Sequence, residues 1–92
     1  MRIPVTHTFA RTVKKLQKQQ KAALDEAVRT IALQPAAGET KGGDLSGVQV
    51  YKFRMGILLC LMAYRILDEN TLKLLMVGPH ENFYRDIEQI DP

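Results

Sequence analysis

The sequence of 92 residues contains little of what marks an exported or metal-dependent protein. Its single cysteine, Cys60, lies inside an apolar run, so a disulfide framework is excluded and we interpret the thiol as a small buried hydrophobe. Histidine is equally scarce, because His7 and His80 are the only two. These three side chains give no cluster with metal-ligand spacing, and we expect no metal and no cofactor.

Long apolar stretches are also missing. The longest run covers residues 57–64 and ends at Arg65, far short of the ~20 residues that a membrane helix needs. The N-terminus, Met1-Arg2-Ile3-Pro4, lacks the apolar core of a secretory signal. We therefore expect a cytoplasmic protein, and a chain of this length suits a single domain spanning residues 1–92.

Charge is distributed unevenly along the chain, whose formal net charge is +3. Residues 1–30 carry a balance of +5, whereas residues 79–92 carry a balance of −3. A basic first third can attract polyanions or an acidic partner, and a solvated helix face is the ordinary alternative. The candidate polyanion-binding lysines of this region are Lys14, Lys15, Lys18 and Lys21, and RNA backbone is one such polyanion.

The first third predicts a strand followed by two helices. Ile3, Val5 and His7 alternate with other residues, which indicates a short first strand. Two apolar stripes at helical spacing follow, separated by the polar residues 17–21. We expect a helical hairpin with its turn near residues 18–21, one long bent helix being the alternative, and an end at Pro35. The stripes consist of Phe9, Val13 and Leu16, and of Leu24, Ala27, Val28 and Ile31.

The second half predicts an antiparallel meander. Residues 36–47 contain four glycines and no aromatic residue, so we expect a surface loop that closes with a turn at residues 44–47. Strands are then expected over residues 48–54, 57–67 and 71–77, and the apolar middle one should be covered on both faces. Leu72, Leu74 and Met76 should share one face of the third strand, and Pro79 suits the first turn of a final helix.

The element order is therefore β-α-α-β-β-β-α. Consecutive strands of a meander pair with one another, and the helical hairpin can bury its apolar stripes only against one face of the sheet. We predict an α+β fold in which a helical hairpin packs on a small antiparallel-meander sheet. The last helix should have an apolar side formed by Phe83, Ile87 and Ile90.

Four segments, in the right order, resemble the RelE/ParE superfamily of toxins from type II toxin–antitoxin systems, and the resemblance covers nearly the whole chain. It implies a toxin neutralised by a cognate antitoxin. RelE-like members enter the ribosomal A site and cut mRNA, whereas ParE-like members poison DNA gyrase on the same fold. The segments are Lys41-Gly42-Gly43-Asp44-Leu45-Ser46-Gly47, Val50-Tyr51-Lys52-Phe53-Arg54, Tyr64-Arg65-Ile66-Leu67-Asp68-Glu69 and Val77-Gly78-Pro79-His80-Glu81-Asn82-Phe83-Tyr84.

Cutting RNA through its 2′-hydroxyl needs proton transfer and cations that stabilise the charge on the phosphate, but no metal. Lys52 and Arg54 are two residues apart on a strand, so they point the same way and could share a phosphate; an exposed polar strand end is the alternative. The resemblance implies that basic residues at these positions contact the scissile phosphate.

His80 and Tyr84 complete the candidate catalytic set. His80 is expected in the first turn of the last helix, whose positive end would favour a neutral, proton-transferring imidazole. Tyr84, four residues later, would share its helix face and stack on a base or orient the substrate. A surface or capping histidine and a core tyrosine are the alternatives. Arg65 is a further candidate RNA contact, unless it pairs with Asp68 or Glu69.

One position departs from the RelE pattern. Such nucleases commonly carry an arginine three residues before the third-strand tyrosine, and this chain has Leu61 there. Arg54 or Arg65 would have to substitute for that cation. Our hypothesis is a ribosome-dependent mRNA endonuclease (an mRNA interferase) that inhibits translation and forms a hetero-oligomer with its antitoxin. The alternatives are a DNA gyrase inhibitor without nuclease activity and a non-toxic module that binds antitoxin or acts as a co-repressor.

Overall fold

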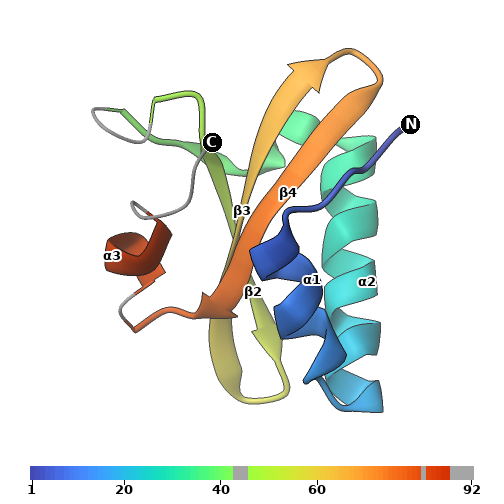
Figure 1. Cartoon of the computed structure of the whole chain (residues 1–92), viewed down its shortest axis with the longest axis vertical. Helices are drawn as coiled ribbons and strands as arrows, with labels where there is room; N and C mark the ends of the chain where they lie inside the picture. Colours follow the sequence, from blue (N-terminus) through green and yellow to red (C-terminus); the bar gives the residue numbers. More distant parts are fainter. Residues whose placement is uncertain (43–45, 82, 88–92) are drawn as a thin grey trace.

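The computed structural model describes residues 1–42, 46–81 and 83–87. An antiparallel sheet in the order β1-β2-β3-β4 runs through the molecule; α1 and α2 cover one face of it and α3 lies against the other (Figure 1). The α+β class and the meander are therefore confirmed. The strands are β1 Glu39–Thr40, β2 Gln49–Met55, β3 Leu58–Asp68 and β4 Thr71–Pro79. The α-helices are α1 His7–Lys14, α2 Lys18–Leu33 and α3 Phe83–Ile87.

The predicted first strand is wrong in extent. Only Arg2 and Val5 form isolated bridges, and they run parallel to the outer edge of β4. The helix begins at His7 because Thr6 caps it: the Thr6 hydroxyl accepts a hydrogen bond from the Phe9 N–H at 3.0 Å. The same hydroxyl donates to the Leu75 carbonyl at 2.6 Å, which fixes the start of α1 on the sheet.

The turn of the helical hairpin lies earlier than expected. It occupies residues 15–17, and the polar stretch at residues 18–21 forms the first turn of α2 instead. The reason is a capping box, in which the Gln17 N–H donates to the Gln20 side chain at 2.8 Å. At the other end α2 stops before Pro35, as predicted, and a 3-10 turn Pro35–Ala37 follows.

The expected surface loop contains the edge strand β1. Glu39 pairs with Val50, and Thr40 pairs with Gln49. The pairing continues one residue further, because the Lys41 N–H donates to the Val48 carbonyl at 3.0 Å. The predicted closing turn falls partly on residues 44 and 45, which lie outside the described residues.

Strand β3 is buried on both faces over residues 60–64, which confirms the prediction for the middle of the strand; at the ends, Ile57 lies outside β3, and Leu58, Ile66 and Leu67 are exposed. Side chains 60–64 are 0–1% exposed and alternate between two apolar clusters. On the helix side, Cys60, Met62 and Tyr64 pack with residues of α1 and α2. On the other side, Leu61 and Ala63 pack with β2 and α3. The sheet therefore divides the core into a helix face and an α3 face.

Strand β4 deviates from simple alternation. The predicted shared face of Leu72, Leu74 and Met76 holds only as far as Leu74, because a register shift between Ala63 and Tyr64 inserts an extra residue into β4. Leu75 consequently joins the α3 face and Val77 returns to the helix face.

The end of β4 also corrects the sequence prediction. Pro79 pairs with Cys60 as the last residue of the strand, so it does not open the final helix. Helix α3 begins at Phe83, whose side chain is buried together with that of Ile87 as expected. The predicted third apolar residue, Ile90, lies outside the described residues.

The hydroxyl of Tyr64 connects the central strand to the chain between α2 and β1. It donates to the Pro35 carbonyl at 2.6 Å and accepts from the Gly38 N–H at 3.0 Å. Burial raises the pKa of this phenol, so it stays protonated and remains a donor. A Cβ on Gly38 would lie 2.5 Å from the Tyr64 oxygen, so only glycine fits there. The contact sets where β1 begins.

We predict that Tyr64→Phe lowers the free energy of unfolding by about 1–3 kcal/mol, because the Pro35 and Gly38 backbone groups lose their partner in a buried place. Urea unfolding followed by circular dichroism measures the change. Tyr51→Phe is the control, since that ring is only half-buried and its hydroxyl makes no hydrogen bond among the described residues. Equal losses in the two variants would contradict a special role for the Tyr64 hydroxyl.

Candidate functional site

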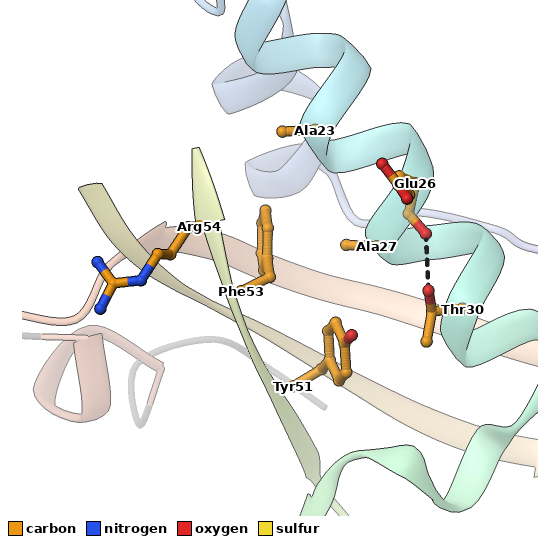
Figure 2. Close-up of a pocket in the computed structure, with 7 residues that line it drawn as sticks. All are labelled: Ala23, Glu26, Ala27, Thr30, Tyr51, Phe53 and Arg54. Carbon is orange, nitrogen blue, oxygen red and sulfur yellow. Dashed lines mark hydrogen bonds between the residues drawn. The ribbon is translucent and has the colours of Figure 1, made fainter. Parts of the chain in front are cut away.

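Lys52 and Arg54 lie on the same side of β2, as predicted, and both are exposed. They alternate with Tyr51 and Phe53, whose stacked rings face α2. Figure 2 shows this division: the two rings point toward α2, whereas the Arg54 guanidinium points away from it. The two cations therefore belong to the α3 face of the sheet.

The strand register aligns these cations with the end of β4. Arg54 pairs with Leu59, and the Leu59 carbonyl accepts a hydrogen bond from the His80 N–H at 3.1 Å. Neighbouring strands are ~4.8 Å apart, so the backbones of Arg54 and His80 are separated by about 10 Å. Long side chains from the two ends of this row can approach one anion between them.

The cations of this row are not neutralised inside the described part of the chain. The ion pairs found there are Glu39–Lys41 and Arg85–Asp86, and neither includes Lys52 or Arg54. The Arg54 Nη1 donates to the Ile57 carbonyl at 3.2 Å, an exposed contact that water can replace. Both charges thus face solvent and are available to an anionic ligand.

His80 is not in the first turn of a helix, contrary to the prediction. It lies in the bend between β4 and α3, so the positive end of the helix cannot be invoked for its protonation state. Its ring nevertheless meets that of Tyr84, edge to face, with centroids 6.4 Å apart. Tyr84 is half-buried and also contacts the Phe83 ring at 5.7 Å. The expected pairing of His80 with Tyr84 therefore occurs through the bend rather than along a helix.

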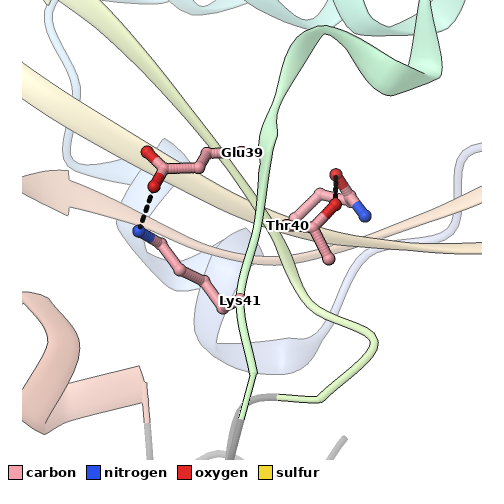
Figure 3. A network of polar contacts seen from close by, with 4 residues as sticks. Glu39, Thr40 and Lys41 are labelled. Atoms are coloured by element: carbon pink, nitrogen blue, oxygen red, sulfur yellow. Dashed lines mark hydrogen bonds and ion pairs between the residues drawn. The ribbon is translucent and has the colours of Figure 1, made fainter.

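Lys41 approaches this pair from the opposite edge, and the sequence pattern did not point to it. Its Nζ lies 5.1 Å from the centroid of the Tyr84 ring and 3.2 Å from the Glu39 carboxylate. Figure 3 shows the ion pair between Glu39 and Lys41, with Thr40 pointing the other way. The neighbouring Tyr84 side chain, and then Glu39, raise the pKa of Lys41. The spacing of Glu39 and Lys41, two residues apart as on one face of a strand, was a signal in the sequence. It was obscured because the surrounding glycine-rich segment predicts a loop.

The floor beneath these side chains is apolar. Leu61 is 1% exposed, and it packs in one cluster with Val48, Val50 and Phe83, against which Tyr84 lies. The position where the resemblance implies an arginine therefore supplies no charge to the α3 face. The described cations nearest to this floor come from the edge strands β1 and β2.

Arg65 does not replace the missing arginine. Its Nη1 donates to the Ser46 carbonyl at 3.0 Å, so the predicted pairing with Asp68 or Glu69 is wrong. It lies four residues along β3 from Leu61, a distance of ~13 Å in a strand. The structure therefore keeps Arg65 apart from Lys52 and Arg54, at the end of the sheet nearest the Ser46–Gly47 turn.

The four lysines of the helical hairpin form a separate surface. All are exposed around the α1–α2 turn, on the opposite face of the sheet from Lys52 and Arg54 (Figure 1). No group of metal-ligating side chains occurs among the described residues. None of the described helices is long and apolar enough to cross a membrane.

Residues 3–88 match the sequence profile of the ParE-like toxins of type II bacterial toxin–antitoxin systems. This match covers almost the entire chain and agrees with the observed meander and helical hairpin. The chain therefore belongs to this family of toxins. No curated protein sequence matches it significantly.

Solved structures of RelE toxins share the fold. A chain of the Escherichia coli RelBE toxin–antitoxin complex matches with a TM-score of 0.71 at 17% identity, covering 87% of this chain and 96% of that one. A mutant of E. coli RelE in the free state gives a TM-score of 0.73 at 16% identity, covering 95% and 90%. A chain of the Mycobacterium tuberculosis RelBE2 complex gives 0.66 at 28% identity, covering 86% and 96%.

We predict that Tyr84→Phe lowers the pKa of Lys41 more than Glu39→Gln does, since the Tyr84 side chain is the larger of the two influences that raise it. An NMR titration of the Lys41 side chain measures both changes. Tyr51→Phe, on the other face of the sheet, should leave this pKa where it is. An unchanged value in Tyr84→Phe would show that the Tyr84 hydroxyl does not raise the pKa of Lys41.

Proposed function

We propose that this toxin is a ribosome-dependent mRNA endonuclease, an mRNA interferase that inhibits translation without a metal. The observation that carries the proposal is the row across the α3 face. Arg54, with Lys52 beside it, lies at one end, and His80 lies at the other. Both cations are exposed and have no carboxylate partner among the described residues. Such an arrangement suits a phosphodiester lying across the sheet.

The proposed chemistry is attack of the RNA 2′-hydroxyl on the adjacent phosphate. Lys52 and Arg54 stabilise the negative charge that develops on the phosphate oxygens. His80 exchanges a proton with the reacting oxygens, because its exposed imidazole has ring nitrogens that can donate or accept a proton. Tyr84, whose ring meets His80, orients the strand by stacking on a base. A cyclic phosphate and a free 5′-hydroxyl are the expected products.

The lysines of the helical hairpin have a separate part in this proposal. Lys14, Lys15, Lys18 and Lys21 are exposed and would contact ribosomal RNA backbone. Each contact adds a sequence-independent, salt-dependent contribution to binding. Because these residues and the α3 face lie on opposite sides of the sheet, docking on the ribosome and holding mRNA do not compete for one surface.

We predict that Arg54→Ala reduces cleavage about 100-fold or more, the usual effect of removing a group that stabilises transition-state charge. His80→Ala should reduce it by about 100-fold, as loss of a general acid or base does. A translation reaction with defined mRNA, with products mapped to the A-site codon, measures both. Arg29→Ala, exposed on α2, is the matched control. Full inhibition with intact mRNA would refute the nuclease.

A gyrase inhibitor without nuclease activity is the second candidate, and burial of Leu61 favours it, because this position offers no charge to a transition state. A supercoiling assay with purified gyrase separates the two. Inhibition there, with uncut mRNA in translation, supports the second candidate. A chain that leaves cells viable when induced alone would instead be a non-toxic module that binds antitoxin.

The RelBE structures that resemble this chain are toxin–antitoxin complexes, and we propose that a cognate antitoxin covers the α3 face of this toxin. Saturating antitoxin should therefore raise the melting temperature of the toxin. At an antitoxin concentration of 100 times its Kd, the folded toxin should be stabilised by about 2.7 kcal/mol. Reversing both charges, Lys52→Glu with Arg54→Glu, should weaken this gain, because an acidic segment would lose its partners. An equal gain for both proteins would show that the antitoxin binds elsewhere.

A further inference from the structure

We propose that Lys41 is the third cation of the α3-face site and that it holds a phosphate flanking the one that is cut, beside Tyr84. The ligand is the backbone of a single-stranded RNA, so the inference rests on the proposed function. In the sequence this lysine is the first residue of one segment that resembles the toxin family, with no role attached to it; the backbone pairing that continues past β1 brings it to the site.

The first step is the register of the sheet edge. Glu39 pairs with Val50, and the Lys41 N–H bonds to the Val48 carbonyl, so Lys41 lies opposite Val48. Side chains of paired residues share a face, and Val48 and Val50 belong to the α3 cluster. Lys41 therefore emerges on the same face as Lys52, from the strand next to it.

The second step is the contact with Tyr84. The Lys41 ammonium lies 5.1 Å from the ring centroid, while His80 and Phe83 meet the ring with interplanar angles of 87° and 86°. The tyrosine is thus held between a cation and two edge-to-face rings. A base that stacks on Tyr84 would have its phosphate within reach of the Lys41 ammonium.

The third step is the internal partner of Lys41. The Glu39 carboxylate lies 3.2 Å from its Nζ; the Glu39 side chain is 76% exposed and the Lys41 side chain 23% exposed. Because water reaches the carboxylate, the ion pair is weak, and a phosphate, which carries more charge and several acceptor oxygens, can take the place of the carboxylate. Glu39 orients the Lys41 side chain in the free protein, and the ion pair breaks when Lys41 binds the RNA phosphate.

Distance along the strand decides which phosphate Lys41 contacts. Val48, opposite Lys41, is four residues from Lys52, which is ~13 Å in a strand. At that separation, and with its ammonium held against Tyr84 and Glu39, Lys41 is placed to hold a neighbour of the scissile group. Its contribution is therefore the same in the bound substrate and in the transition state, and it should appear in KM rather than in kcat.

The test combines binding and cleavage for Lys41→Met. Binding is measured by fluorescence anisotropy with a 2′-O-methyl RNA oligonucleotide, which cannot be cut. We expect about fivefold weaker binding at 0.1 M salt and a salt dependence less steep by about 0.7, the effect of one lost phosphate contact on a single strand. Cleavage on the ribosome should show a similar rise in KM with kcat within about twofold.

Two further variants keep the inference falsifiable if Lys41→Met folds poorly. Lys41→Arg retains the cation and should bind as the parent does, whereas Glu39→Gln removes the competing carboxylate and should tighten binding. Arg29→Met removes an exposed cation from α2, so it should leave kcat and KM unchanged.

The outcomes separate this inference from the proposed function. Binding and salt dependence unchanged in Lys41→Met, or kcat reduced with KM unchanged, overturns the role of Lys41. A parent protein that binds the oligonucleotide but cuts no mRNA overturns the nuclease and leaves the Lys41 contact supported by its binding data. A parent protein that binds no RNA overturns both.

Discussion

Burial of β3 on both faces is the constraint on which the rest of the structure depends. Residues 60–64 are 0–1% exposed, and their side chains alternate between two apolar clusters. Each cluster needs its own cover, because an apolar sheet face left in water is unfavourable. The helical hairpin covers one face, and the short helix α3 covers part of the other. The remaining part of the α3 face is where polar side chains of the edge strands can reach solvent, and it is there that the candidate site lies.

The same constraint explains why the cations of this site stand at its margin. An arginine at position 61 would place its charge in the cluster that contains Val50 and Phe83, where an unpaired guanidinium is costly. Leucine at this position stabilises the core but leaves the centre of the α3 face uncharged. Positive charge must then come from the outer part of the sheet, which supplies Lys52 and Arg54 from β2 and Lys41 from the residue that follows β1. The centre of the α3 face therefore carries no cation. The cations lie at its margin, beside the apolar cluster against which Tyr84 packs.

The elements that the sequence predicted well are those with a strong apolar or alternating pattern. The double-sided burial of β3 followed from its uninterrupted apolar run, and the common direction of Lys52 and Arg54 followed from the period of two in a strand. The errors fall where several tertiary contacts compete. Residues 2–5 alternate like a strand but obtain only two bridges, since Thr6 caps α1 at once. Pro79 is compatible with the start of a helix and with the end of a strand. Its pairing with Cys60 makes it the end of β4. The place of Lys41 beside the site was not predicted, because the glycine-rich composition of its segment indicates a loop. A strand as short as β1 forms only through its pairing with β2, which the local sequence does not reveal.

Two basic surfaces on opposite sides of the sheet define how the molecule can meet a polyanion. The hairpin lysines and the Lys52–Arg54 pair are separated by the sheet and by a helix layer, which is itself about 10 Å thick. The Debye length at physiological ionic strength is about 8 Å, so each surface attracts phosphate largely independently of the other. A single flat strand of RNA can occupy one surface at a time. Occupying both requires a partner that encloses the domain, whose extents are 31 × 29 × 22 Å. That geometry favours a cavity walled by RNA over a free transcript, and it supports the proposal that this toxin acts on mRNA in the ribosome.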